Sequence, residues 1–215
     1  MAKIGVLGAG TWGMALARML SNSGREVTVW SALPQEVDEL SRTRRQKNLP
    51  GMVIPDEIKF TKEIAEACQD KDIILFAVPS VFVRSTAKTA AAFIPDGQII
   101  VDVAKGIEPD TLLTLTEVIA DELNKDGKHG NVHYVALSGP THAEEVAKDL
   151  PTTIVSACED QAVAEKVQDV FMNKNMRVYT NSDRLGVELC GALKNVIALA
   201  SGICSGLGYG DNMRA

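Results

Sequence analysis

Residues 3–13 read KIGVLGAGTWG, a short apolar strand that runs directly into a glycine-rich turn. A helical pattern comes after the turn, and a second strand begins near Glu26. In this context Gly8 permits the tight bend, Gly10 lets the backbone approach a pyrophosphate, and Gly13 lets the helix pack closely on the strand. The free N–H groups of the helix's first turn then face the phosphates. The stretch therefore predicts a dinucleotide-binding turn rather than an empty one.

The composition is typical of a soluble globular protein. Of the 215 residues, 46% are hydrophobic, and the mean hydropathy is +0.03. The net charge of −6 argues against a general nucleic-acid binder. We expect no apolar run to reach the roughly 18 residues of a membrane span, and so no membrane insertion. Because the first strand begins at once, we also expect no signal peptide.

The four cysteines give no sign of a disulfide framework or a metal site. They form no C-x-x-C pair, and no histidine lies at metal-ligand spacing from them. We therefore expect free thiols in a reducing cytoplasm and no bound metal.

Strand and helix patterns alternate over residues 1–182, which predicts an α/β domain with a mostly parallel sheet covered on both faces. The apolar run at 72–78 is typical of a central parallel strand. Further strands are expected at 27–30, 58–60, 98–103, 133–137, 152–156 and 176–179. Helices are expected at 34–45, 62–69, 81–93, 111–123 and 161–171.

The pattern changes after Ser182. Residues 183–206 predict one long helix with many small residues, which indicates close packing against another element. No strand signal returns before the last residue, Ala215. We interpret residues 183–215 as the beginning of a truncated helical second domain.

Three motifs come directly after predicted strands, where an open α/β sheet places its ligands. They are AVPS at 77–80, VAKG at 103–106 and LSGPT at 137–141. Lys105 comes directly after a buried strand and is well placed to reach an anion. Thr141 and Glu144 have the spacing of a capping box, which predicts a helix N-terminus suited to a negatively charged substrate. His142 between them is expected to be a surface residue rather than a catalytic base.

Lys194 and Asn195 interrupt a helix that is otherwise apolar or built of small residues. Gly191 and Lys194 are three residues apart and share a face of this helix. Burial of a lysine is costly, so we expect the charged form of Lys194 to be disfavoured there. A second ammonium nearby, such as that of Lys105, would act in the same direction. Such a lysine is suited to proton transfer.

Taken in order, five motifs resemble those of the bacterial NAD(P)-dependent glycerol-3-phosphate dehydrogenases: GAGTWG at 8–13, VPS at 78–80, AKG at 104–106, SGPT at 138–141 and GALKNV at 191–196. The resemblance covers the whole chain. It implies a doubly wound Rossmann-type domain followed by a helical substrate domain. It further implies reversible reduction of dihydroxyacetone phosphate, a small phosphorylated substrate, to sn-glycerol 3-phosphate, which feeds glycerophospholipid synthesis. A cytoplasmic homodimer is expected of the full-length protein.

The resemblance also implies a role for individual residues. Lys194 is expected to give and take the proton, with Asn195 beside the substrate. Substrate contacts are expected from Lys105, Gly139, Thr141, Lys194 and Asn195. Cofactor contacts are expected from Gly8, Gly10, Thr11, Trp12, Gly13, Ala32, Lys105 and Ala143.

Two features depart from the family's pattern. Further substrate ligands of the family, an aspartate and an arginine–asparagine pair, belong to a carboxyl half that this chain does not reach. His142 stands where relatives usually carry Phe or another apolar residue, which affects the expected shape of the pocket wall.

The second strand bears on the choice of cofactor. It ends in WSAL at 30–33, where a strict NAD enzyme usually carries Asp or Glu for the ribose 2′-hydroxyl. Without that carboxylate nothing repels a 2′-phosphate, and basic residues come later at Arg42, Arg44, Arg45 and Lys47. We therefore expect NADPH to be accepted, with NADH alongside it.

Two other functions remain open on the residues. A β-hydroxyacid or ketopantoate-type reductase would share the architecture but would act on a carboxylate instead of a phosphate. A non-catalytic NAD(P)H sensor would bind the cofactor alone, and it would not need both Lys105 and Lys194.

Overall fold

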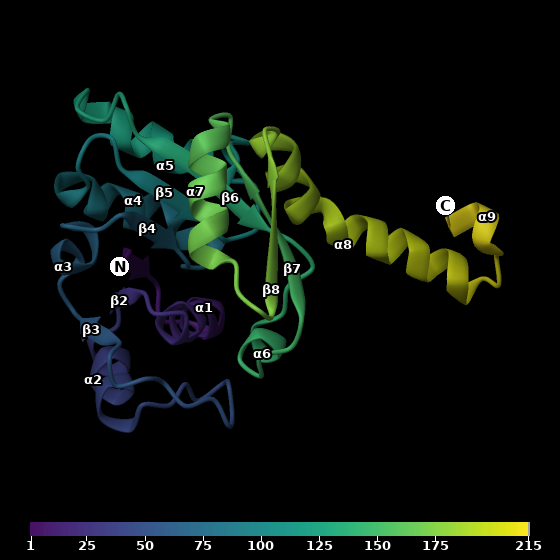
Figure 1. The fold of residues 1–215 in the computed structure, drawn as a ribbon. Coiled ribbons are helices and arrows are strands. Elements are labelled where there is room, and N and C mark those ends of the chain that lie inside the picture. Colours follow the sequence, from purple (N-terminus) through teal and green to yellow (C-terminus); the bar gives the residue numbers. More distant parts are fainter. Residues whose placement is uncertain (215) are drawn as a thin grey trace.

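The computed structural model describes residues 1–214 and shows an eight-stranded sheet with helices on both faces (Figure 1). The strand order is β3-β2-β1-β4-β5-β6-β7-β8. Within it β6 and β7 run antiparallel, and the other described neighbours are parallel. The predicted doubly wound, mostly parallel sheet is confirmed. The strands are β1 (Lys3–Leu7), β2 (Glu26–Trp30), β3 (Lys59–Thr61), β4 (Ile73–Phe76), β5 (Ile99–Asp102), β6 (His133–Ser138), β7 (Thr152–Ala157) and β8 (Met176–Asn181).

The helices keep the expected alternation with the strands. They are α1 (Thr11–Asn22), α2 (Pro34–Thr43), α3 (Ile64–Cys68), α4 (Val83–Ala90), α5 (Leu115–Leu123), α6 (Ala143–Val146), α7 (Gln161–Phe171), α8 (Arg184–Gly206) and α9 (Asp211–Arg214). Short 3₁₀ turns lie at η1 (Ser80–Phe82), η2 (Ala91–Phe93) and η3 (Asn124–Asp126).

The sheet is buried on both faces because successive side chains of a strand point to opposite sides. In β4, Ile73 and Leu75 join the core beneath α1 and α7, whereas Ile74 and Phe76 join the core beneath α3, α4 and α5. All four side chains are fully buried. Burial of each contributes about 1.5–3 kcal/mol relative to exposure. The continuous apolar run is therefore the sequence signature of this central position.

The expected helix at 111–123 begins later than predicted. Leu112 adopts a left-handed φ of 58°, and Glu108 N donates to Leu113 O at 3.0 Å, so this segment forms a turn. Helix α5 starts at Leu115, after an N-cap at Thr114 that forms a capping box with Glu117. The α-helical part of 81–93 is likewise shorter, because 3₁₀ turns occupy both its ends.

Helix α8 confirms the long helix expected at 183–206 and extends away from the sheet (Figure 1). By length and composition it could cross a membrane, because it contains an 18-residue stretch with a mean hydropathy of 1.5, none of it buried. The expectation that no segment reaches this length and hydropathy is therefore wrong. Lys194 and Asn195 are too few polar residues to offset the apolar and small residues around them.

Candidate functional site

A cavity of about 410 Å³ opens beside the carboxyl ends of β1, β4 and β5. It is lined by the glycine turn at 10–12, the strand ends at 77–80 and 103–105, and the segment 141–144. Segments more than 130 residues apart in the sequence thus meet at the edge where an α/β sheet places its ligands. The cavity thus brings the glycine turn together with residues of the three motifs that follow the predicted strands.

The glycine turn has the three features predicted from its sequence. Gly8 adopts a φ of +122°, and a Cβ there would lie 2.7 Å from the Ala77 carbonyl carbon. A Cβ on Gly13 would overlap the Gly8 carbonyl oxygen. Around Gly10, by contrast, no described atom lies within 4 Å of an added Cβ. The turn is therefore tight where helix and strand meet and open where a pyrophosphate would approach.

Helix α1 also leaves its N-terminus available. Its N-cap is Gly10, and no side chain in the described structure caps it. The first N–H groups of a helix have no partner within the helix, and they carry the positive end of its dipole. They open into the cavity through Thr11 and Trp12, which suits a phosphate.

Lys105 is the charged centre of the cavity. Its Nζ donates to the Thr141 hydroxyl at 3.2 Å, and that hydroxyl donates weakly to the Gly139 carbonyl at 3.4 Å. Burial lowers the pKa of Lys105, and the nearby charge of Lys194 acts in the same direction. A partly desolvated ammonium interacts strongly with an incoming anion.

Two glycines let the chain close around Lys105. A Cβ on Gly191 would lie 2.9 Å from the Ser138 hydroxyl and 3.8 Å from Cγ of Lys105, so α8 can pass close to this side chain. Gly106 adopts a φ of +156°, and its Cβ would lie 3.0 Å from that of Ser80. The backbone thus passes close to Ser80 directly after Lys105, and α8 passes close to the Lys105 side chain at Gly191.

The expected burial of Lys194 is wrong for the described structure. Lys194 and Asn195 are exposed, and Lys194 Nζ donates to Asn195 Oδ1 at 2.8 Å. The reason is that α8 packs against the sheet only through its first turns and then projects beyond it (Figure 1). The desolvated lysine of the site is Lys105, and the catalytic role of Lys194 stays a prediction.

The expected capping box at Thr141 and Glu144 is also wrong. Helix α6 has only four residues, its N-cap is His142, and no described side chain caps it. The Thr141 hydroxyl is instead used by Lys105 and Gly139. His142 is exposed on the cavity wall, as expected of a surface residue.

The remaining predicted residues divide into three groups. Those that line the cavity are Gly10, Thr11, Trp12, Lys105, Thr141 and Ala143. Gly8, Gly13 and Gly139 lie behind its wall as backbone positions, and a Cβ on Gly139 would lie 2.7 Å from the Thr153 carbonyl. Ala32, Lys194 and Asn195 lie outside the lining.

A buried carboxylate, Glu188, was not identified from the sequence. Its Oε1 accepts from Thr116 N at 2.9 Å, and its Oε2 accepts from the hydroxyls of Thr114 at 3.0 Å and Thr116 at 2.6 Å. Arg184 pairs with it at 3.2 Å and with Glu159 at 2.9 Å. The signal in the sequence was the spacing of Arg184 and Glu188, four residues apart in an apolar helix. Glu188 fastens α8 to the N-terminus of α5.

Asp102 lies next to this cluster at the end of β5. It is fully buried, and burial raises its pKa well above the usual range, with the charge of Glu188 adding to the effect. Its Oδ1 accepts from Ala104 N at 3.3 Å, which supports the turn that leads to Lys105.

The end of β2 does carry a carboxylate, contrary to the sequence expectation. Ser31 Oγ donates to Glu36 Oε2 at 2.6 Å, so the first turn of α2 brings the acidic group back to the strand end. The expectation that nothing there opposes a 2′-phosphate is therefore wrong. Glu36 comes five residues after Ser31 in the sequence, so its contact with the end of β2 was not predicted.

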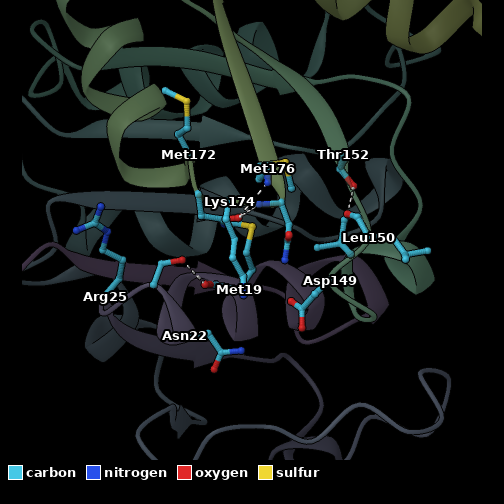
Figure 2. Close-up of a pocket in the computed structure, with 13 residues that line it drawn as sticks. Met19, Asn22, Arg25, Asp149, Leu150, Thr152, Met172, Lys174 and Met176 are labelled. Atoms are coloured by element: carbon cyan, nitrogen blue, oxygen red, sulfur yellow. Dashed lines mark hydrogen bonds between the residues drawn. The ribbon is translucent and has the colours of Figure 1, made fainter.

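A second cavity, of about 390 Å³, lies between the end of α1 and the segments before β7 and β8 (Figure 2). None of the predicted site residues line it. Its polar groups serve the fold: Thr152 Oγ1 donates to Leu150 O at 3.1 Å, and Asn173 Oδ1 accepts from two backbone N–H groups. Asp149 forms a two-bond ion pair with Arg18 at 3.0 and 2.9 Å. Among the described residues no group of three or more His, Cys, Asp or Glu could hold a metal ion.

Comparisons with known proteins agree with this geometry. Residues 3–164 match the family model of the NAD-dependent glycerol-3-phosphate dehydrogenase N-terminus, and residues 183–215 match that of its C-terminus. The chain is 98% identical over its full length to glycerol-3-phosphate dehydrogenase [NAD(P)+] 2 of Lactobacillus delbrueckii subsp. bulgaricus, and covers 64% of that protein. It is 49% identical to glycerol-3-phosphate dehydrogenase [NAD(P)+] of Agathobacter rectalis, covering 62% of it.

A solved structure shows the same fold. Glycerol-3-phosphate dehydrogenase from Coxiella burnetii superposes with a TM-score of 0.85 at 34% identity, over 99% of this chain and 64% of that one. The chain thus spans less than two thirds of the length of these relatives. On these matches, the chain belongs to the NAD-dependent glycerol-3-phosphate dehydrogenase family.

Proposed function

We propose that this chain supplies the cofactor domain and the first substrate-domain helix of an enzyme that reversibly reduces dihydroxyacetone phosphate to sn-glycerol 3-phosphate with NADPH or NADH. The observation that carries the proposal is the cavity in which the open glycine turn faces a partly desolvated Lys105. The first part of that site suits a pyrophosphate, and the second suits an anionic substrate.

The residues present fit a dinucleotide. The uncapped N-terminus of α1 offers N–H donors, and Gly10 leaves the space above the turn free of described atoms. When bound, the nicotinamide supplies or accepts the hydride at C2 of the substrate. Thr11, Trp12 and Ala143 would hold the cofactor from the cavity wall.

The substrate side rests on two lysines. Lys105, held by Thr141 at 3.2 Å, would orient the substrate and polarise its C2 oxygen. Lys194 would give a proton to that oxygen in reduction and remove it in oxidation. Asn195, whose Oδ1 accepts from Lys194 Nζ at 2.8 Å, would orient this ammonium beside the substrate. Gly139 would contribute its backbone next to Thr141.

Substitution of Gly10 tests cofactor binding without disturbing the fold. Gly10 has a φ of −64°, which alanine adopts freely, and an added methyl meets no described atom within 4 Å. The same methyl would occupy the space needed by the pyrophosphate. We expect Gly10→Ala to fold normally and to lose NADPH binding in a fluorescence titration. Gly130→Ala is the matched control, because its methyl also meets no described atom within 4 Å and lies outside the cavity. Equal binding by the two variants would contradict the proposal.

A turnover assay with the full-length protein distinguishes the alternative functions. We expect oxidation of NADPH with dihydroxyacetone phosphate and none with ketopantoate or other carboxylate substrates. Turnover of the carboxylates instead would favour the β-hydroxyacid reductase class, and cofactor binding without any turnover would favour a sensor.

We assign residues 1–182 to the cofactor domain and 183–215 to the start of the helical substrate domain. The family models support this division, because they match on either side of it. The exposed apolar side chains of α8 are then covered in the complete protein, within a helical domain and a homodimer, and not by a membrane. The buried hydrogen bond of Glu188 with Thr116 and the ion pair of Arg184 with Glu159 connect α8 to the sheet domain and support this view. We place the enzyme in the cytoplasm, in keeping with four free cysteines, and its product in glycerophospholipid synthesis.

A further inference from the structure

The chain after Lys105 folds back on itself before α5 begins. Ile107 and Thr114, the two ends of this return turn, form an isolated β-bridge. Between them Glu108 N donates to Leu113 O at 3.0 Å. Lys105 therefore lies between two supports, with the end of β5 before it and the return turn after it.

An arginine of α4 holds the return turn from the side. The Arg84 guanidinium binds the Glu108 carboxylate through two parallel hydrogen bonds, from Nε at 2.7 Å and from Nη2 at 2.6 Å. The Thr111 hydroxyl donates to the same carboxylate at 2.6 Å. A two-bond contact of this kind restrains the orientation of both partners as well as their distance. The hydrogen bonds from Arg84 lower the pKa of Glu108 to about 2, so the carboxylate stays ionised at neutral pH.

Arg84 is itself held by α5. Its Nη1 donates to Glu122 at 2.7 Å and also to Asp121. The Glu122 side chain is buried and pairs with Lys125 at 2.6 Å. Because Nη1 contacts α5 while Nε and Nη2 contact the return turn, the guanidinium connects α4, α5 and the return turn at one point.

The stretch of chain that carries Arg84 also forms one wall of the cavity that contains Lys105. Ser80 lines this cavity and begins η1, and α4 comes directly after η1. A Cβ on Gly106 would lie 3.0 Å from Cβ of Ser80, so the chain meets this wall one residue after Lys105. The ion pair of Arg84 with Glu108 then joins the same two segments a second time, farther from the cavity.

The second connection matters because Gly106 is a permissive joint. Gly106 adopts a φ of +156°, and a glycine gives the backbone more freedom than any other residue. The end of β5, where Ala104 N donates to Asp102, therefore does not by itself determine the direction of the chain after Lys105. The two-bond contact with Arg84 supplies a restraint on the other side of this joint.

We infer that the ion pair of Arg84 with Glu108 positions Lys105, because it holds the return turn against α4 and so keeps the lysine at the substrate side of the cavity. Neither Arg84 nor Glu108 lines the cavity, so both act through Lys105 and are positioning residues. The inference rests on the proposed function, because it requires that Lys105 hold the substrate.

The test is steady-state kinetics on the full-length enzyme, with dihydroxyacetone phosphate varied at saturating NADPH. Glu108→Gln removes the charge and one of the two acceptors of Arg84. We expect it to lower kcat/KM about tenfold or more, chiefly through a higher KM, because a displaced Lys105 holds the substrate less well. The dissociation constant of NADPH should stay within about threefold, since the glycine turn is unchanged.

The division between KM and kcat separates positioning from stability. A variant that is merely unfolded in part loses kcat in proportion to its inactive fraction, and the KM of the folded fraction does not change. A rise in KM therefore reports on the geometry of the folded site.

Asp121→Asn is the matched control. Asp121 pairs with the same guanidinium but belongs to α5, and Glu122 still accepts from Nη1 of Arg84 at 2.7 Å. Each of the two variants neutralises one carboxylate partner of Arg84, so a cluster that only stabilises the fold would respond alike to both. We expect Asp121→Asn to leave KM and kcat/KM within about twofold of the parent, as is usual for an exposed ion pair.

Arg84→Gln and the double variant Arg84→Gln/Glu108→Gln complete a cycle. Glu122 keeps Lys125 as a partner when Arg84 is removed, so its buried carboxylate stays paired. We expect Arg84→Gln to raise KM as Glu108→Gln does. If the two residues act as a unit, adding Glu108→Gln to Arg84→Gln should change KM by less than about twofold.

The outcomes separate the inference from the proposed function. If the parent enzyme does not turn over dihydroxyacetone phosphate, the proposed function fails and the inference fails with it. If the parent is active but Glu108→Gln behaves like Asp121→Asn, or loses kcat at an unchanged KM, the inference alone is overturned. Additive effects of Arg84→Gln and Glu108→Gln on KM would also overturn it. A rise in KM that Glu108→Gln shares with Arg84→Gln, and that Asp121→Asn lacks, supports both.

Discussion

Replacement of Glu188 by alanine should detach α8 from the sheet domain. The carboxylate is buried, with its side chain 6% exposed, and it satisfies Thr116 N, the hydroxyls of Thr114 and Thr116, and the guanidinium of Arg184. Removal leaves a helix N-terminus short of an acceptor, which costs about 1 kcal/mol. It also removes one of the two carboxylates that pair with Arg184, which keeps its ion pair with Glu159, so this loss lies below the ~3–5 kcal/mol of a fully broken buried pair.

These contributions share atoms and are not additive, so we expect a total loss of about 3 kcal/mol. That is a large part of the ~5–15 kcal/mol by which a domain of this kind is stable. The measurement is urea unfolding followed by circular dichroism and tryptophan fluorescence. Amide exchange at the first turns of α5 and α8 should accelerate in the same variant.

Glu159→Ala is the matched control. Glu159 also pairs with Arg184, at 2.9 Å, but its side chain is 64% exposed. Its removal should cost no more than about 1 kcal/mol, as is usual for exposed ion pairs. A similar loss of stability in the two variants would refute the reasoning that burial and helix capping make Glu188 the anchor.

Three further results are expected. In the full-length enzyme, Lys194→Ala should lower turnover by roughly 10²-fold through loss of a positioned proton donor, with cofactor affinity nearly unchanged; near-normal kcat would remove Lys194 from the mechanism. Residues 1–215 alone should bind dinucleotide but turn over dihydroxyacetone phosphate at a negligible rate, because they lack the family's further substrate ligands; activity equal to that of the full-length Lactobacillus relative would show the missing part to be dispensable. Asp102→Asn should raise the melting temperature at pH 7. The pKa of Asp102 is raised in the folded protein, so the wild-type protein loses stability as the pH rises above about 3.9, the pKa of an aspartate in the unfolded chain, and the advantage of Asn should vanish below that pH. An equally large gain in melting temperature in acid would contradict this.

The sheet was predictable because its signals are local. The apolar run around Ile73–Phe76 and the glycine turn at Gly8–Gly13 each specify their own conformation, and the structure places both as expected. The order of the motifs along neighbouring strands then placed Lys105 and Thr141 in one cavity without knowledge of any contact.

The capping box shows where local signals are ambiguous. The pattern Thr-x-x-Glu occurs at Thr141–Glu144 and again at Thr114–Glu117, and only the second forms the box. The two segments differ in the helix after the pattern, because α5 buries Leu115, Val118 and Ile119, whereas α6 ends after four residues. Spacing within four residues carries no information about that burial.

The electrostatics of the site could not be read from the sequence because they depend on packing between distant segments. Lys194 stands in an apolar helix yet is exposed, and Lys105 stands in a loop yet is partly desolvated. Glu36 reaches the end of β2 only because Ser31 turns its hydroxyl toward it. Each of these outcomes is decided by a contact that no single stretch of sequence contains.

The antiparallel pairing of β6 and β7 sets the direction in which the second domain grows. Because β7 is antiparallel to β6 and parallel to β8, the carboxyl ends of β7 and β8 both point toward the edge of the sheet opposite the cavity. Helix α8 therefore starts toward the opposite edge of the sheet and runs back toward the cavity. Its Glu188 contacts the N-terminus of α5, and its Gly191 lies beside Lys105. If β7 were parallel to β6, β8 would end at the same edge as the cavity, and the helix after β8 would run away from the cavity. The orientation of one strand thus directs α8 toward the cavity.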